Sequence, residues 1–565
     1  MKKTDRREFF LQTGYVAAGF AGLQRFLASA SSAAEPSSGP GVRRGSASGF
    51  PFRAHEQPYQ SELEGLGKLV RDPLRVIDLP EGFSYKVLSV TGDPMDDGLK
   101  TPGGPDGMAA FAGPDGRIIL VRNHELEDQM TFEGAYGVTN ANLGKLDPAK
   151  IYDSGKGVRP QLGGTTTLVY NPESGEVERK FLSLAGTTRN CAGGPTPWGT
   201  WITCEESVVR PKSDEEIAKA KKFEEWGGGN KSDDEKARAK AEREKRMAVL
   251  SPKRRRQVEQ EEAEKKRREG EPDSEAYLEK WHGYNFEVPA SNEMGLADPV
   301  PLKQMGRFNH EAIAVEPESG IIYQTEDRDD GLITRFLPTE PGNLRAGGRL
   351  QALVIKGNLS CDTRNWPTTG EPTLPVGEAM EVEWMDLEDL DSPKDDLRTR
   401  AYDRGAAIFA RGEGMWHGNG KIYFACTSGG VAQSGQIFIY EPSPVEGTAS
   451  EREQPGRLTL FLEPNNVQLL QYGDNLTVSP WGDVVLCEDG PQDQYLRGIT
   501  RDGRIYTLGR CGYEGDSEMC GCCFAPDHPV LFVNIQRPGI TLAITGPWEK
   551  LAAEAVTPRG RTSGS

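Results

Sequence analysis

Gly116-Arg117-Ile118-Ile119-Leu120-Val121, which leads into Asn123-His124-Glu125, is one copy of a unit that recurs along this chain of 565 residues. Each copy has a turn with Gly or Pro, a short run rich in residues that favour β-strands, and a polar or acidic end. The other five copies are Trp198–Cys204 before Glu205-Glu206, Gly320–Tyr323 before Thr325-Glu326-Asp327, Gly420–Phe424 before Thr427, Gly482–Cys487 before Glu488-Asp489, and Pro529–Val533 before Asn534. Because no copy can bury its faces alone, the repeat predicts that the units pack against one another.

Further β-rich runs lie between the copies, for example 165–170 and 436–440, and turn signals bound them. We therefore predict an all-β fold, a β-propeller of about six blades over residues 75–550. The copies are irregularly spaced, about 50 to 100 residues apart, which is unlike a WD40 array. An assembly of β-sandwiches, or two unrelated β domains, is the alternative.

The N-terminus has the pattern of an export signal. Arg6-Arg7 followed by Phe9 resembles a twin-arginine signal, and a weakly apolar run over 15–23 precedes an A-x-A cleavage site at Ala28-Ser29-Ala30. We predict a signal peptide over 1–30, a linker and N-terminal extension over 31–74, the twin-arginine export machinery as a partner, and a periplasmic or secreted protein. A basic N-terminus with a chance pair of arginines is the alternative.

A charged segment, residues 207–281, interrupts the repeats. Within it, residues 231–270 hold 15 Lys/Arg and 10 Asp/Glu, and its Glu, Lys, Arg and Ala favour helix. We predict a helical insertion within the propeller, either a solvated arm or an arm that binds a partner. Residues 551–565 are expected to form a flexible C-terminal tail.

Composition excludes two classes of partner. The formal net charge of −18 argues against a nucleic-acid binder, since phosphate backbones require a basic surface. No stretch of 18 uncharged apolar residues occurs, so stable membrane insertion is not expected. The nine cysteines are scattered and odd in number, and whether Cys511, Cys520, Cys522 and Cys523 form disulfides stays open.

Acids recur at the ends of the β runs. In a propeller the innermost strands surround one axis, so acids at their ends converge, and converging carboxylates repel one another unless cations neutralise them. A multi-metal site is therefore predicted, and its candidate ligands are Glu125, Glu206, Glu326, Asp327, Glu488 and Asp489, together with Glu311 after His310. Taken singly, each of these acids would be read as a turn or cap residue.

The stretch Ala185-Gly186-Thr187-Thr188-Arg189-Asn190-Cys191-Ala192-Gly193-Gly194, continuing to Cys204-Glu205-Glu206, resembles the signature of the PhoX alkaline phosphatases. Further matching segments are Arg122–Glu125, His282-Gly283-Tyr284, Gly306–Ala312, Arg411–Gly414, Asp474-Asn475-Leu476 and Glu488-Asp489-Gly490. The resemblance covers about 75–548 apart from the charged insertion. It implies a six-bladed propeller, export by the twin-arginine route, and a phosphatase that acts on phosphate monoesters at a centre of iron and calcium.

By the same resemblance, the site holds two oxo-bridged ferric ions, Fe(III), together with Ca²⁺. Cys191 would ligate iron with Glu311 and Glu413, and the acids of the repeats would be Ca²⁺ or mixed ligands. Arg411 would clamp the transferred phosphoryl group, and Asn534 would be a second polar contact. The resemblance also implies a small soluble phosphoester as substrate and a monomer.

Two other functions stay open at this point. One is a Ca²⁺-binding propeller without phosphatase activity, and the other is a Ca²⁺-dependent hydrolase similar to lactonases, which would leave Cys191 unexplained. The chain also departs from some family members, which carry a Lys shortly before the signature cysteine. Lys180 and Arg189 are the nearest basic residues here. The insertion follows Glu206 directly and would restrict the channel mouth.

Overall fold

The computed structural model describes residues 59–63, 66–213, 215–219, 274–369, 374–491, 493–513 and 517–555. The predicted signal peptide, most of the predicted linker, most of the charged insertion and the last ten residues lie outside these ranges. Within the insertion, residues 215–219 are helical. No helix among the described residues is both long enough and apolar enough to cross a membrane.

The described chain is mostly β. Its strands are β1 (Leu69–Val70), β2 (Ile77–Pro80), β3 (Ser84–Val90), β4 (Pro105–Ala112), β5 (Ile118–His124), β6 (Gly163–Asn171), β7 (Glu176–Thr187), β8 (Asn190–Pro195), β9 (Thr200–Glu205), β10 (Asn285–Pro289), β11 (His310–Val315), β12 (Ile322–Glu326), β13 (Ile333–Pro338), β14 (Gly348–Ile355), β15 (Ala379–Asp386), β16 (Gly412–Gly418), β17 (Lys421–Cys426), β18 (Gln436–Glu441), β19 (Arg457–Leu462), β20 (Gly473–Val478), β21 (Val484–Glu488), β22 (Tyr495–Ile499), β23 (Ile505–Cys511), β24 (Met519–Phe524), β25 (Val530–Ile535) and β26 (Ile540–Thr545). The helices are α5 (Leu397–Asp403) and α6 (Glu549–Ala555), and several loops contain short 3-10 helices.

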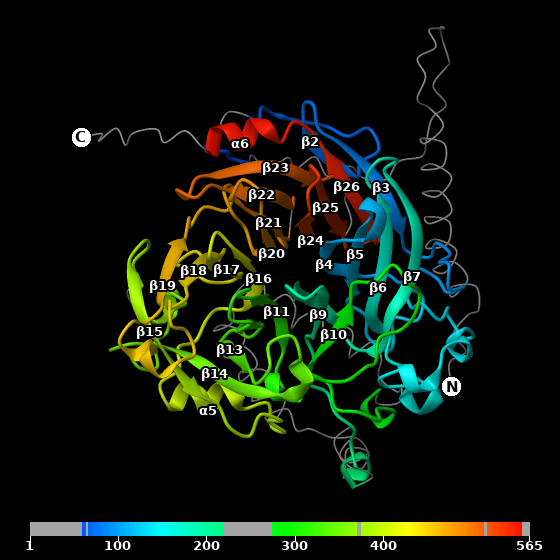
Figure 1. Ribbon diagram of the computed structural model, residues 1–565, viewed down its shortest axis with the longest axis horizontal. Helices are drawn as coiled ribbons and strands as arrows, with labels where there is room; N and C mark the ends of the chain where they lie inside the picture. Colours follow the sequence, from blue (N-terminus) through cyan, green and yellow to red (C-terminus); the bar gives the residue numbers. More distant parts are fainter. Residues whose placement is uncertain are drawn as a thin grey trace, which may run out of the picture. The chain divides into compact units, whose positions relative to one another are not determined.

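The strands form antiparallel meanders around a common axis (Figure 1). The innermost strands β4, β8, β11, β16, β20 and β24 each lie beside the next, and β24 lies beside β4, which closes the ring. The predicted β-propeller is confirmed. Hydrogen bonds define five sheets, because β15 pairs with both β14 and β19 and so joins two meanders into one sheet of nine strands.

Strands from the two ends of the described chain complete the ring. β3 pairs with β26 and becomes the outer strand of the sheet that begins with β24. β2 pairs with β23, and β1 pairs with β2, so the end of the predicted N-terminal extension belongs to a sheet. At the C-terminus, α6 continues to Ala555, so the first residues of the predicted tail are helical. The charged insertion separates β9 from β10, the second and third strands of one meander.

The core lies between neighbouring sheets. β5 is buried along its whole length because other sheets cover both of its faces, which explains its continuous apolar run. One apolar cluster joins Ile118 and Leu120 of β5 to Phe532 of β25. Another joins Phe424 of β17 and Phe438 of β18, whose rings stack at 5.2 Å, to Tyr323 of β12. The six meanders are therefore held by apolar contacts between sheets.

Small residues pack at the axis. A Cβ on Gly107 would lie 2.6 Å from the Ala192 Cα, and a Cβ on Gly414 would lie 2.7 Å from the Asn475 Cα. Ala192 and Ala312 fill the same level, and the cavity that remains there holds only about 20 Å³. The innermost strands therefore approach one another more closely than larger side chains would permit.

Candidate metal centre

The second residue of each innermost strand is an acid or a cysteine. In ring order these residues are Asp106, Cys191, Glu311, Glu413, Asp474 and Cys520. Directly after the start of each strand, its register with the following strand shifts. A local irregularity of this kind re-aims side chains, and its recurrence in all six strands gives the site its repeated geometry.

A second tier of polar residues follows the second strand of each meander. The same backbone hydrogen bond places each of them, from its own N–H to a carbonyl two residues before the second residue of the innermost strand. These N–H donors belong to Glu125, Glu206, Asp327, Thr427, Asp489 and Gln536. Four of the six are acids that the sequence predicted as ligands, and the structure places them around the same axis.

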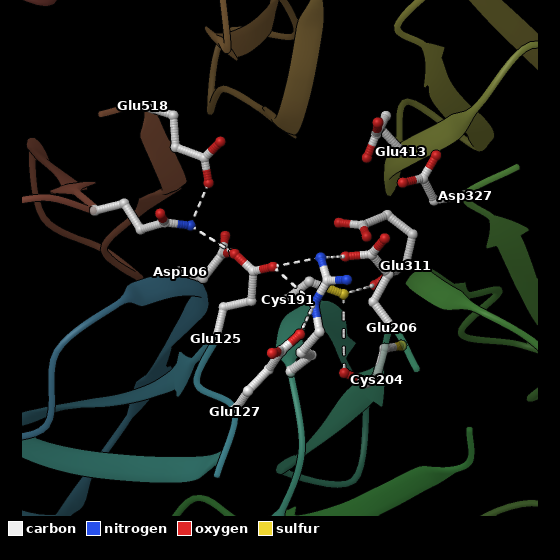
Figure 2. A network of polar contacts seen from close by, with 12 residues as sticks. Asp106, Glu125, Glu127, Cys191, Cys204, Glu206, Glu311, Asp327, Glu413 and Glu518 are labelled. Atoms are coloured by element: carbon white, nitrogen blue, oxygen red, sulfur yellow. Dashed lines mark hydrogen bonds and ion pairs between the residues drawn. The ribbon is translucent and has the colours of Figure 1, made fainter. Parts of the chain in front are cut away.

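The carboxylates and thiols approach one another closely enough to share cations. In each of four groups, the candidate ligand atoms all lie within 4.8 Å of one another. The groups are Cys191 with Glu206 and Glu311, Glu311 with Glu413 and Asp474, Asp474 with Asp489 and Glu518, and Asp106 with Glu518 and Cys520. Figure 2 shows Glu206, Glu311, Asp327 and Glu413 pointing toward one another; Glu311 and Glu413 belong to β11 and β16, and Glu206 and Asp327 follow the ends of β9 and β12. Successive groups share members, so the donors form one continuous cluster.

The electrostatics of this cluster favour cation binding. Burial raises the pKa of Glu206 to about 8, with Asp327 and Glu125 adding to the shift and Arg189 opposing it. Burial and neighbouring carboxylates also raise the pKa values of Asp106, Glu311 and Glu518 well above the usual range. Carboxyl groups that bind protons this tightly would exchange them for metal ions.

The donor chemistry fits two kinds of metal. Carboxylate oxygens suit Ca²⁺ and ferric ions, whereas a thiolate selects a transition metal. Burial, and then Glu311, raises the pKa of the Cys191 thiol, so a bound cation would be needed to hold its thiolate form. The donor set therefore fits a mixed centre better than a site for calcium alone.

Two arginines lie among the acids. Arg411 Nε lies 2.6 Å from an Asp327 oxygen, its Nη2 contacts both Asp327 and Glu413, and the side chain is buried. Arg189 bridges Glu125 and Glu206 with Nη2–oxygen distances of 2.8 and 2.7 Å, and its side chain is 30% exposed. Arg411 lies two residues before Glu413, and Arg189 lies two residues before Cys191. Both arginines have a positive φ, 55° for Arg411 and 47° for Arg189. The same local backbone thus brings two guanidinium groups to the site.

The structure gives Glu326 and Glu488 other partners, and we drop them from the candidate ligands. Glu326 accepts a hydrogen bond from the Leu332 N–H at 3.0 Å and lies 3.6 Å from Arg398. Glu488 pairs with the buried Arg497 at 2.9 Å and accepts hydrogen bonds from the backbone of Gln471 and Tyr495. Both acids precede a tier residue by one position, and successive side chains on a strand point to opposite sides.

Asn534 also has a different place from the one expected. Its side chain is fully buried, its Nδ2 donates to the Asp106 carbonyl at 2.6 Å, and its Oδ1 accepts from the Thr541 hydroxyl at 2.6 Å. These bonds join β25 to β4 and β26, and they engage both the nitrogen and the oxygen of the side-chain amide. Asn534 thus supports the backbone beside Asp106, and its proposed contact with substrate is withdrawn.

Sequence reasoning missed Asp106, Asp474, Glu518, Cys520 and Arg189. A signal for Asp106 was present: Asp106-Gly107-Met108 has the same order of acid, glycine and methionine as Glu413-Gly414-Met415, which contains a predicted ligand. The predicted acids of the repeats lie at the ends of the second strands, whereas Asp106 lies at the start of an innermost strand. All nine cysteines are buried with free thiols, so no bridge to Cys511 forms.

Comparison with known proteins gives one family and several solved structures. The family model described as alkaline phosphatase PhoX matches residues 65–539. The structure of Pseudomonas fluorescens PhoX in complex with vanadate, a transition state analogue, matches with a TM-score of 0.54 at 14% identity, over 87% of this chain and 97% of that one. A gluconolactonase from Xanthomonas campestris matches with a TM-score of 0.32 at 11% identity, over 89% of this chain and 99% of that one. No curated protein matches the sequence.

Proposed function

The chain belongs to the PhoX family of alkaline phosphatases, and from this premise we propose that it hydrolyses small phosphate monoesters at a centre of iron and calcium ions held by the acid cluster. The observation that carries the proposal is the buried Cys191 thiol, which lies with Glu206 and Glu311 in one group of donors. A calcium-binding propeller without activity, or a lactonase-like hydrolase, requires no thiol at this position.

Different residues of the cluster would hold the two kinds of metal ion. Cys191, Glu206, Glu311 and Glu413 would surround the iron ions, and Asp106, Asp474, Asp489 and Glu518 would hold calcium. When bound, the cations would supply the positive charge that attracts the phosphate oxygens and stabilises the leaving alkoxide. Without that charge, a channel lined by carboxylates would repel a dianionic substrate.

The arginines would orient the phosphoryl group. Arg411 is held by Asp327 and Glu413, so its guanidinium is fixed before substrate arrives. A planar guanidinium can donate two parallel hydrogen bonds to a phosphoryl group, which a lysine cannot do. Arg189, the more exposed of the two, would attract the incoming anion, and cation binding by Glu125 and Glu206 would release it from these partners.

We also propose that the protein reaches the periplasm or the medium by the twin-arginine route. That route exports folded proteins, so the metals would be loaded before export. The support for this proposal is the Arg6-Arg7 pattern together with membership of the family. Replacing both arginines with lysine should leave the protein in the cytoplasm, which cell fractionation would detect.

The test of the catalytic proposal is metal analysis of the natively exported protein combined with turnover of p-nitrophenyl phosphate. We expect iron and calcium in the purified protein, loss of turnover with EDTA, and recovery when Ca²⁺ is added. Cys191→Ala should abolish iron loading and turnover while leaving the fold intact. Cys523→Ala is the matched control, because Cys523 is equally buried but packs in the apolar core. Full turnover in Cys191→Ala would overturn the assignment.

A further inference from the structure

A buried imidazole lies between two carboxylates directly behind the acid cluster. His282 Nδ1 is 2.7 Å from Glu205 Oε1, and Nε2 is 3.3 Å from Asp153 Oδ2. All three side chains are fully buried. Both ring nitrogens face acceptors, so the doubly protonated ring satisfies both contacts, whereas a neutral ring has only one N–H to donate.

The remaining acceptor positions of the two carboxylates collect backbone N–H groups from separate segments. Glu205 accepts from Thr188 at 3.0 Å, Gly283 at 2.9 Å and Tyr284 at 3.2 Å. Asp153 accepts from Gly155, Glu279 and Lys280 at 2.8 to 2.9 Å. One buried group of charges therefore ties together the 153–155 loop, the turn before β8, the end of β9 and the segment 279–284.

Two residues of this hydrogen-bonded group, Glu205 and Thr188, lie beside residues of the metal centre. Glu205 is the last residue of β9, and Glu206, its neighbour, is in the donor group of Cys191. Thr188 immediately precedes Arg189, whose carbonyl accepts from the Glu206 N–H at 3.0 Å, and Cys191 follows two residues later. Displacement of the Glu205 carboxylate would therefore move both Glu206 and the turn that carries Arg189 and Cys191.

The same group closes the base of the charged insertion. The His282 N–H donates to the Val209 carbonyl at 3.0 Å, and Arg307 Nε donates to the His282 carbonyl at 2.7 Å. Arg307 also donates to the Val208 and Val209 carbonyls. The chain thus leaves and re-enters the propeller at one hydrogen-bonded point. For this reason we expect the positions of the metal donors not to depend on the conformation of the insertion.

We propose that His282 is a positioning residue for the metal centre: as an imidazolium between Glu205 and Asp153, it fixes Glu206 and the Thr188–Cys191 turn in the geometry that metal binding requires. The inference rests on the proposed metal-dependent function. Burial would by itself lower the pKa of His282, but the two carboxylates outweigh it and raise the pKa to about 9, which agrees with a charged ring at neutral pH. Groups that orient metal ligands from behind typically change metal affinity about 10- to 100-fold when they are replaced.

The experiment measures the affinity of the purified chain for cobalt(II), used alone as a probe after chelation of the resident metals. His282→Gln leaves two buried carboxylates without a cation, and we expect its cobalt affinity to fall by at least about tenfold. At saturating metal, KM for p-nitrophenyl phosphate should change little, because His282 touches no substrate. The matched control is His417→Gln, which replaces a half-buried histidine near the other end of β16.

Charge rescue separates positioning from a merely structural role. In His282→Gln/Asp153→Asn, one negative charge leaves together with the positive one, so the buried net charge equals that of the wild type. We expect this double variant to regain most of the cobalt affinity. A folded His282→Gln chain with unchanged affinity, or a double variant as weak as the single one, would overturn the proposal.

Three further outcomes are distinct. If His282→Gln does not fold, Asp153→Asn is measured in its place. We expect its cobalt affinity to fall about threefold, because the contact of the imidazolium with Glu205 remains. Unchanged cobalt affinity would then count against the proposal. A wild-type chain that binds cobalt but hydrolyses no phosphoester would contradict the proposed function and leave the positioning test valid. A wild-type chain that binds no cobalt would overturn both.

Discussion

The second strand of three meanders ends on an acid that a second acid follows directly, and the two members of each pair lie in different surroundings. The first members, here called the outer acids, are Glu205, Glu326 and Glu488, and the second members, the inner acids, are Glu206, Asp327 and Asp489. Outer acids bind partners within or between the sheets: His282 for Glu205, the Leu332 N–H for Glu326, and Arg497 for Glu488. Inner acids lie around the axis.

The difference follows from a step of one residue. Side chains alternate along a strand, so consecutive acids point to opposite sides, and only one can reach the axis. Glu206 and Asp327 are buried like the outer acids, and Asp489 is half-buried. The outer acids pair with groups of their own or neighbouring sheets, whereas the inner acids gather with further carboxylates around the axis. We therefore expect the outer acids to contribute to the fold and the inner acids to the proposed function. Variants at the two kinds of position test this division.

The largest expected effect is at an inner acid. Glu206→Gln removes one carboxylate from the group with Cys191 and Glu311, and we expect turnover of p-nitrophenyl phosphate to fall by at least about 100-fold. Without metal, the variant should be no less stable than the wild type, because one source of repulsion is removed. Turnover, iron content and the unfolding midpoint after chelation provide the check. Near-normal turnover with full iron content would remove Glu206 from the site.

Next in size is the effect of an outer acid. Glu488→Gln leaves the fully buried Arg497 guanidinium without its anionic partner, which typically costs about 3–5 kcal/mol. We expect denaturant unfolding to show this loss, while the folded variant keeps its metal content. Asp489→Asn, one residue further, is the comparison: it should lower calcium binding and leave metal-free stability nearly unchanged. The reverse pattern would break the division between outer and inner acids.

How much of this the sequence predicts depends on the scale. The turn and β-run repeat predicts the propeller, because each copy shows its own turn and apolar run. The same repeat cannot show which of two consecutive acids points to the axis. Glu488 and Asp489 are equally good candidate ligands until the hydrogen-bond register of the strands is known. Glu518 and Asp106 lie far apart along the chain and meet only when the ring closes between β24 and β4. Arg189 stands in the signature stretch of the sequence, but its role depends on the positive φ that turns its side chain toward Glu206.

A pH dependence of stability is expected from His282, the partner of the outer acid Glu205. The folded pKa of His282, about 9, exceeds the ordinary value of 6.5, so its contribution to stability is complete below pH 6.5 and is lost as the pH rises through 9. The full loss amounts to about 3 kcal/mol, since one pKa unit corresponds to about 1.4 kcal/mol. Tyr152, whose ring packs against His282, stays neutral over this range because burial raises its pKa. Arg307 donates to the His282 carbonyl, and burial lowers its pKa from the ordinary value.

The measurement is urea unfolding of the metal-free protein between pH 6 and pH 10. The wild type should lose stability across this window, and His282→Gln/Asp153→Asn should lose markedly less, because its pair of amides does not titrate. Equal slopes for the two proteins would show that His282 is neutral in the fold and would place the pH dependence elsewhere.

The smallest effect is expected at Glu326, which sharpens the comparison among the outer acids themselves. Its ion pair with Arg398 is long, at 3.6 Å, and Arg398 has other partners in Asp330 and Asp395. In Glu326→Gln the amide oxygen can still accept the Leu332 N–H, and Arg398 keeps its other carboxylates. Burial moreover raises the pKa of Glu326 to about 7, so the carboxyl group is readily neutralised in the wild type. We therefore expect Glu326→Gln to cost no more than about 1 kcal/mol in urea unfolding. A loss as large as that of Glu488→Gln would mean that burial alone, rather than the partner that an outer acid neutralises, decides how much it contributes to the fold.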